Sequence, residues 1–251
     1  MGAIQPGPVP EITQAQARAK EASGLTKVIL FGVHNLAGKA FSWAIGLYVL
    51  GSVFTSLRSV IPAGGPVANS TISPPINGTS SRAFEYLGPL FRNVYLLLPI
   101  TVVIQLAAIA ILTLGFRDLG KVDRSRFSTP STLMLIMVAG TFLAAAGALL
   151  LFNVLSGFAS VPPPMVQPAG ALAAVGSIFL DSIVALVGGI LTLVGLVGGL
   201  MLGLWRVGSR YEETLLKVAA IFVIIPFLNF VSPILVIVGA HGARARLSQA
   251  P

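Results

Sequence analysis

The chain has 251 residues, of which 55% are hydrophobic and only 10% are charged. Soluble domains carry about 25% charged residues, so this composition excludes a soluble globular fold and predicts an integral membrane protein. The absence of cysteine excludes disulfides and thiolate chemistry. The net charge of +8 is spread between apolar segments, which excludes a nucleic-acid-binding patch and favours membrane lipids as partners.

The chain begins with a polar segment, 1–24, which contains three prolines and lacks the basic start and apolar core of a signal peptide. We expect it to be a retained cytoplasmic tail. In the following segment, 26–38, apolar residues such as Ile29 and Val33 fall at helical spacing while Lys27 lies on another face. This pattern predicts an amphipathic helix that lies at the membrane interface.

The membrane domain is expected to cover 25–240, followed by a short C-terminal tail over 241–251. A spanning helix needs about 20 largely apolar residues, because each residue rises about 1.5 Å through a hydrocarbon core about 30 Å thick. We therefore predict an all-α protein with about five spans, at 40–57, 94–116, 131–152, 182–204 and 215–240. The segment 117–129, between the second and third spans, is predicted to be a short polar loop.

The loop over 58–87 gives the orientation. It contains two N-glycosylation triplets, at Asn69 and Asn77, which predict that this loop is extracellular. With five spans and a cytoplasmic N-terminus, 11 basic residues lie inside and 5 outside, in agreement with the positive-inside rule. We therefore expect a multi-pass protein of the cell membrane.

The fifth predicted span is interrupted by Pro226 and Pro233, which flank Asn229. Each proline removes a backbone donor and clashes with the preceding turn, so the helix must break here. We favour one kinked span, because two half-crossings of about 11 residues are each too short to span. The alternative is a re-entrant hairpin, which would bring the C-terminus inside and change the basic balance to 13 against 3.

The fourth predicted span is rich in glycine. Gly195, Gly199 and Gly203 recur every four residues and form two overlapping G-x-x-x-G units on one helix face. Such a face allows close helix contact in lipid, where the apolar effect does not drive association. The third span offers a partner face of small residues with the same spacing, Gly140, Ala144 and Ala148. The pairing could occur within one chain or between copies.

Two stretches resemble a known family. The first is 115–120, GFRDLG, at the end of the second span, and the second is 204–239 in the C-terminal third. Together they resemble an archaeal family of multi-pass membrane proteins known as domain of unknown function nine-seven-three. The resemblance implies a multi-pass helical fold in an archaeal cell membrane, and it implies no activity.

No set of residues predicts catalysis, a cofactor or a metal site. The two histidines lie far apart, and no paired carboxylates or nucleophile motif are present. Asp181 is the one acidic residue near a span, so it is a possible ion or proton site; the alternative is an interfacial carboxylate that is hydrated or paired with Arg92. Glu212 and Glu213 adjoin Arg210 and Lys217, and a solvated loop or an ion pair at a helix end explains them.

The sequence therefore favours a non-enzymatic structural or assembly membrane protein, which forms a homo-oligomer or associates with other membrane subunits. The alternative is a small channel or transporter that uses the broken helix around Asn229, because unwound backbone at mid-membrane commonly binds ions or substrates.

Overall fold

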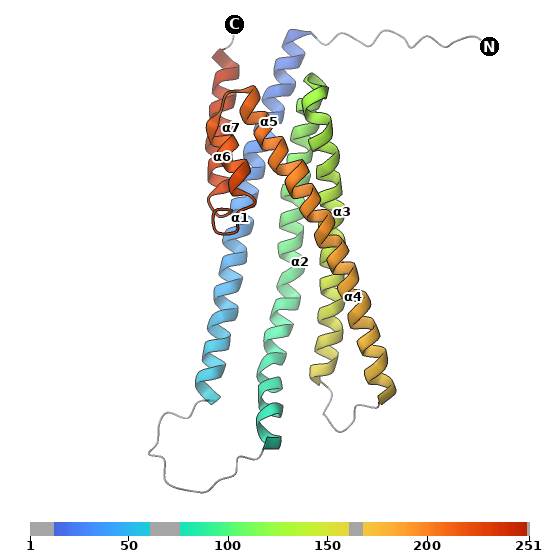
Figure 1. Ribbon diagram of the computed structural model, residues 1–251. Coiled ribbons are helices and arrows are strands. Elements are labelled where there is room, and N and C mark those ends of the chain that lie inside the picture. The colour runs from blue at the N-terminus through green and yellow to red at the C-terminus, as the bar shows by residue number, and fades with distance from the viewer. Residues whose placement is uncertain (1–12, 61–75, 161–167, 250–251) are drawn as a thin grey trace, which may run out of the picture. The chain divides into compact units, whose positions relative to one another are not determined.

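The computed structural model describes residues 13–60, 76–160 and 168–249, and within these ranges it is helical without strands (Figure 1). The elements are α1 (Gln14–Val60), α2 (Ile76–Val122), α3 (Arg124–Ser160), α4 (Pro168–Gly195), the π-helical η2 (Leu196–Met201), α5 (Leu202–Arg210), α6 (Thr214–Phe222) and α7 (Ser232–Gln249). Within these ranges, four stretches are long and apolar enough to cross a membrane: Gln14–Ser52, Leu97–Val122, Arg124–Val154 and Val175–Arg210. The predicted all-α membrane fold is therefore confirmed. The fifth predicted span is not among the four.

Helix α1 corrects the prediction for the N-terminal region. It runs without interruption from Gln14 to Val60, so 26–38 is not a separate interfacial helix and the polar tail does not extend to residue 24. The face expected to be apolar is the more exposed one, since Val33 is 47% exposed while Val28 is fully buried. The helix continues because no proline interrupts it and its apolar residues persist on the buried face.

The predicted loop over 117–129 is also corrected. Helix α2 continues to Val122, and α3 begins at Arg124, so Asp123 alone separates them. The Asp123 carboxylate accepts hydrogen bonds from the Ser125 hydroxyl at 2.7 Å and from the Arg126 backbone N–H at 3.2 Å. These are the contacts of a helix N-cap, and they explain why α3 can start without a longer connection.

The fourth predicted span forms part of a longer helical segment. Helix α4 passes into the π-helical η2 and then α5, which ends at Arg210. Beyond α5, Glu212 has a φ of 55°, in the left-handed region, and the Glu213 N–H donates to the Gly208 carbonyl at 2.8 Å. This wrapped C-terminus terminates the helix and directs the chain into α6.

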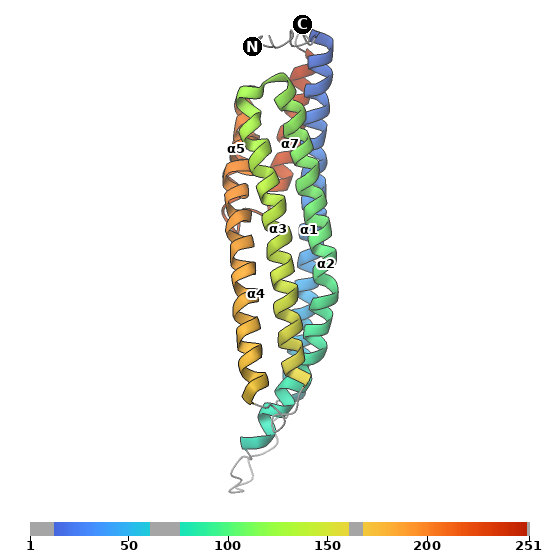
Figure 2. The ribbon, with the colours of Figure 1, turned by 90° about the vertical axis from the view of Figure 1, so that its right-hand side faces the viewer.

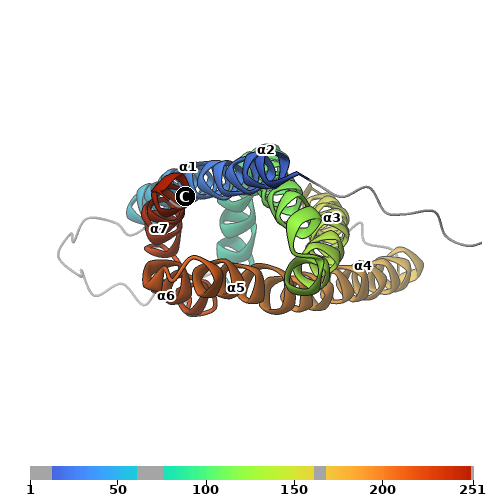
Figure 3. The same ribbon diagram turned by 90° about the horizontal axis from the view of Figure 1, so that it is seen from above.

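The predicted break in the last segment is present, but a single kinked span is wrong. Helix α6 ends at Phe222, and α7 begins at Ser232 and packs back against α6 (Figure 3). The buried Ser232 hydroxyl donates to the Ala219 carbonyl at 3.0 Å, and Gly239 lies against Leu216. The segment is therefore a helical hairpin. Pro233 lies in the first turn of α7, where its missing N–H costs no helical hydrogen bond.

The chain divides into two compact units. Unit 1 comprises Met1–Val33, Ala110–Met134 and Val197–Pro251, and unit 2 comprises His34–Ile109 and Leu135–Leu196. The core of unit 1 is formed by fully buried apolar side chains from α1, α2, α3 and α5, including Leu25, Val28, Phe116, Phe127 and Leu204. The rings of Phe116 and Phe127 stack with centroids 6.4 Å apart.

Close backbone approach in unit 1 depends on paired glycines. A Cβ placed on Gly24 would lie 3.1 Å from the Gly115 carbonyl oxygen, and one on Gly115 would lie 3.2 Å from the Gly24 carbonyl oxygen. Helices α1 and α2 thus cross glycine to glycine, as small-residue interfaces in membranes allow.

Candidate functional site

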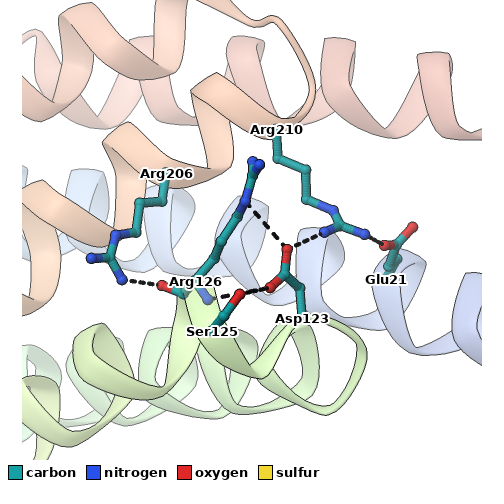
Figure 4. Close-up of polar contacts among 6 residues, drawn as sticks. All are labelled: Glu21, Asp123, Ser125, Arg126, Arg206 and Arg210. Carbon is teal, nitrogen blue, oxygen red and sulfur yellow. Dashed lines mark hydrogen bonds and ion pairs between the residues drawn. The ribbon is translucent and has the colours of Figure 1, made fainter.

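The polar side chains of unit 1 gather around the turn between α2 and α3. Arg210, the last residue of α5, pairs with the Asp123 carboxylate at 2.7 Å and also with the Glu21 carboxylate of α1 (Figure 4). The Glu21 side chain is only 9% exposed and that of Arg210 is 25% exposed. One guanidinium therefore joins α1, the α2–α3 turn and α5, a geometry that suits the planar fork of arginine.

A second arginine of α5, Arg206, supplies a hydrogen bond that is missing from the backbone of α3. Pro130 lies inside α3 and has no N–H to donate to the carbonyl four residues earlier, which is that of Arg126. The Arg206 guanidinium donates to this carbonyl instead (Figure 4). The helix can therefore contain a proline without leaving that carbonyl unsatisfied.

Two further ion-pair groups complete the polar part of unit 1. Asp118 of α2 pairs with Lys27 of α1 and with Lys121 one turn later, the latter at 2.7 Å. Glu213 pairs with Arg246 of α7 at 3.2 Å, and Arg246 also donates to the carbonyls of Tyr211 and Glu212 at 2.9 and 3.0 Å. Glu213 therefore belongs to an ion pair at the start of α6, as expected for a helix-end carboxylate, although its partner is Arg246 and not the neighbouring Arg210, which pairs with Glu21 and Asp123.

The charges perturb the groups at the edge of this cluster. Burial alone would raise the pKa of the Asp123 carboxyl, but hydrogen bonds from Ser125 and the Arg126 N–H and the charge of Arg210 bring that pKa below its ordinary value. Burial raises the pKa of the Tyr211 phenol to about 12, and the negative charge of Glu21 adds to the shift. The cluster thus holds Asp123 ionised and Tyr211 neutral.

The glycines predicted to mediate packing lie against α3. Helices α3 and α4 lie side by side (Figure 2). In unit 2, a Cβ on Gly140 would lie 2.5 Å from the Thr192 nitrogen, and Gly188 and Gly195 lie against the backbones of Ala144 and Met137. Ala148 is only half-buried; Gly147, one residue earlier, is the closer contact, with a Cβ there 2.5 Å from the Ala185 nitrogen. In this part of the seam, α3 and α4 meet within one chain.

In unit 1 the glycine seam changes partners. A Cβ on Gly199 would lie 2.9 Å from the Met134 nitrogen, whereas Gly203 lies against the Phe116 ring of α2. Gly199 belongs to the π-helical η2. The sequence prediction assumed a regular α-helix, in which residues four apart share one face, and did not include this π-helical turn. The inserted π-turn alters the helical register after Gly195.

The remaining predicted residues do not belong to the cluster. Asp181 is buried in α4, with 8% exposure, and the side chain of its proposed partner Arg92 lies outside the described residues. Asn229 is half-buried in the turn between α6 and α7, where its N–H donates to the Ile225 carbonyl at 2.7 Å, and Pro226 is exposed in the same turn. Asn69 lies outside the described residues, and Asn77 falls in the first turn of α2.

Sequence reasoning missed the main members of the cluster, Glu21, Asp123, Arg206 and Arg210. Their one visible signal is the charged composition of 117–129 together with the basic pair in 206–210. In the described part of the chain, no group of three or more His, Asp or Glu residues is placed to hold a metal ion.

Comparison with known proteins decides the family. The family described as "Protein of unknown function (DUF973)" matches residues 41–251, which include both stretches that carried the resemblance. The chain belongs to this family. Neither a curated protein nor a solved structure matches the chain significantly. Membership in DUF973, whose description gives the function as unknown, assigns no activity.

Proposed function

We propose that this DUF973 protein is a non-enzymatic structural or assembly protein of an archaeal cell membrane, which associates with copies of itself or with other membrane subunits. The observation that carries the proposal is that charged side chains of unit 1 pair with one another between helices. In unit 1, the acidic side chains Glu21, Asp118, Asp123 and Glu213 are each paired with a basic residue from another part of the chain. Such pairs join helices.

The topology that goes with this proposal has both termini in the cytoplasm. The α6–α7 hairpin supports it, because a chain that turns back places Arg244 and Arg246 with the basic residues around α5, giving the 13 to 3 balance. The predicted loop over 58–87 is corrected in part, because 58–60 belong to α1 and 76–87 to α2. In this topology the whole segment 58–87 would be extracellular, with Asn69 and Asn77 as glycosylation sites.

The surface for association would lie away from the glycine seam, since α3 already occupies Gly188 and Gly195 in the single chain. Large apolar side chains remain exposed along the spans, for example Phe142, Phe179 and Leu186, each more than 60% exposed. In a bilayer such faces contact either lipid or another protein. The proposal therefore predicts an interface made of lipid-facing apolar side chains.

The test is the composition of the particle extracted from native membranes. The tagged full-length protein would be extracted with a membrane-solubilising polymer, purified, and weighed by native mass spectrometry. We expect a defined species heavier than one chain, either a homo-oligomer or a complex with a second membrane protein in fixed ratio. A species that is monomeric at every concentration, without a stoichiometric partner, would contradict the proposal.

The alternative is a small channel or transporter whose site is the turn around Asn229. It is supported by the helical hairpin, because a short α6 of nine residues, about 14 Å long, cannot cross a bilayer alone. Against it, the facing sides of α6 and α7 are dry: Leu216, Ala219, Ala220, Val236 and Ala240 are all fully buried. Ion or solute flux into liposomes that Asn229→Ala abolishes, with Asn153→Ala as control, would favour transport over assembly.

A further inference from the structure

A pocket of about 520 Å³ lies in unit 1, where α2 turns into α3 beside α1. Four basic residues line it, Lys20, Arg117, Lys121 and Arg124, and none of its lining residues is acidic. Three of them, Arg117, Lys121 and Arg124, follow one another at helical spacing across the turn, and all three are exposed. The lining of the pocket is therefore strongly positive.

Most of this positive charge is not neutralised within the protein. Among the described residues, the ion pairs engage Lys121, through Asp118, but they engage none of Lys20, Arg117 and Arg124. This distinguishes the pocket from the neighbouring cluster, in which Arg210 is held between two carboxylates. Three unpaired cations around one cavity attract an anion.

The rest of the lining suits a phosphate group attached to an apolar body. The hydroxyls of Ser128 and Ser131 of α3 also line the pocket, and the buried rings of Phe116 and Phe127 supply an apolar wall. Arginine guanidinium groups bind phosphate oxygens through paired charge-assisted hydrogen bonds. The same pocket thus offers both ionic and apolar contacts.

The position of the pocket along the spans decides between a soluble anion and a lipid. The apolar run of α2 ends at Phe116, and that of α3 begins at Leu133, so the pocket lies where both runs leave the hydrocarbon core. This is the level of lipid headgroups, and basic pockets between helices at this level are suited to anionic headgroups. A soluble phosphate compound would share the ionic contacts but would not need this position.

We infer that this pocket binds the phosphate of an anionic lipid headgroup, with Arg117, Arg124 and Lys20 as its ligands. The inference does not depend on the proposed assembly function, because it concerns a single chain. A bound headgroup would complete the charge balance at the α2–α3 turn. It would also fix the depth of the turn in the membrane.

The experiment titrates the full-length protein in neutral detergent with short-chain phosphatidylglycerol, with phosphatidylcholine as the uncharged control. Bound lipid is counted by native mass spectrometry. We expect saturable binding of phosphatidylglycerol, and at least about tenfold weaker binding in the Arg117→Gln/Arg124→Gln variant, because it removes two guanidinium groups that can form charge-assisted hydrogen bonds to the phosphate. The matched control is Arg244→Gln, which removes an exposed positive charge of α7 outside the pocket.

A second variant separates the pocket from general surface charge. Ser128→Trp fills the pocket at an exposed position without changing its charge, so it should weaken phosphatidylglycerol binding as well. Equal weakening by Arg244→Gln, or full binding by Ser128→Trp, would overturn the site. Displacement of the lipid by millimolar inorganic phosphate would assign the pocket to a soluble anion and overturn the lipid assignment.

Discussion

The guanidinium of Arg210 donates a hydrogen bond of 2.7 Å to the carboxylate of Asp123, which lies 87 positions earlier in the sequence. Asp123 is at the same time the N-cap of α3. The same carboxylate therefore caps the N-terminus of α3 and binds the last residue of α5. Because Arg210 also pairs with Glu21, any change at Arg210 affects three helices at once.

We predict that Arg210→Gln lowers the free energy of unfolding in mixed micelles by about 2–4 kcal/mol, because it leaves the buried Glu21 carboxylate without its partner. Glu21→Gln combined with Arg210→Gln should cost less than the sum of the two single changes, since no charge is then left unpaired. Denaturant unfolding followed by circular dichroism measures all three. Additive losses would show that Arg210 and Glu21 are not coupled.

The pairing of Arg206 with the Arg126 carbonyl predicts a compensating pair of substitutions. Arg206→Gln should destabilise the protein by about 0.5–1.5 kcal/mol, because the carbonyl left by Pro130 loses its protein donor. In a Pro130→Ala background the helix supplies its own N–H, so the same Arg206 substitution should cost less than half as much. Thermal unfolding of the four proteins tests this. An unchanged cost in the alanine background would rule out the compensation.

The long-range part of the cluster could not be predicted from the sequence. Arg210 and Glu21 are 189 positions apart, and a single sequence contains no signal that associates them. The apolar runs, by contrast, located at least part of each of the four helices that are long and apolar enough to span, because length and hydropathy suffice for that purpose. The hydropathy pattern predicted too long a loop between α2 and α3, because charged residues at a helix end resemble loop residues in composition.

The α6–α7 hairpin is a second feature that the sequence alone did not predict. Pro226 and Pro233 fix where the helix must break, since both a kink and a hairpin result from the same missing donors. Which of the two forms depends on contacts beyond the break. Gly239 allows α7 to lie against Leu216, and Ser232 satisfies the Ala219 carbonyl, so the returning helix has a surface to pack on. Spacing along the sequence alone does not reveal that complementarity.

Tyr211 predicts a loss of stability at alkaline pH. Its folded-state pKa of about 12 lies above the ordinary value of 10.0. The contribution of the neutral phenol to the free energy of unfolding is therefore fully present below pH 10 and is lost as the pH rises towards 12. The hydroxyl is buried and makes no hydrogen bond of ordinary geometry within the described residues. Tyr211→Phe should therefore be neutral at pH 7 and should lose less stability between pH 9 and about 11.5. Parallel profiles for the two proteins would contradict this.

The glycine seam predicts opposite outcomes for two adjacent residues. A Cβ at Gly188 would collide with the Ala144 backbone, whereas one at Gly189 would meet nothing within 4 Å. Gly188→Ala should therefore lower stability by about 1–3 kcal/mol through forced separation of α3 and α4. Gly189→Ala should be neutral or stabilising by up to about 1 kcal/mol, because alanine favours helix. Equal effects would mean that the seam does not determine packing.

The hairpin predicts that the C-terminal helix and the α2–α3 turn lie on the same side of the membrane. Arg246 of α7 donates to the carbonyls of Tyr211 and Glu212, which follow α5, so the end of the chain is fixed beside the start of α6. A single crossing by α6 and α7 would instead separate these groups by the full thickness of the bilayer.

Because the chain has no cysteine, single cysteines at Ser70, Ser125 and Ser248 can be labelled without background. With a membrane-impermeant thiol reagent on intact cells, we expect labelling at position 70 alone, and labelling at 125 and 248 only after the membrane is opened. The charge balance of 13 basic residues against 3 supports this orientation. Labelling at 248 together with 70 on intact cells would restore the single crossing, and labelling at 125 instead of 70 would invert the whole topology.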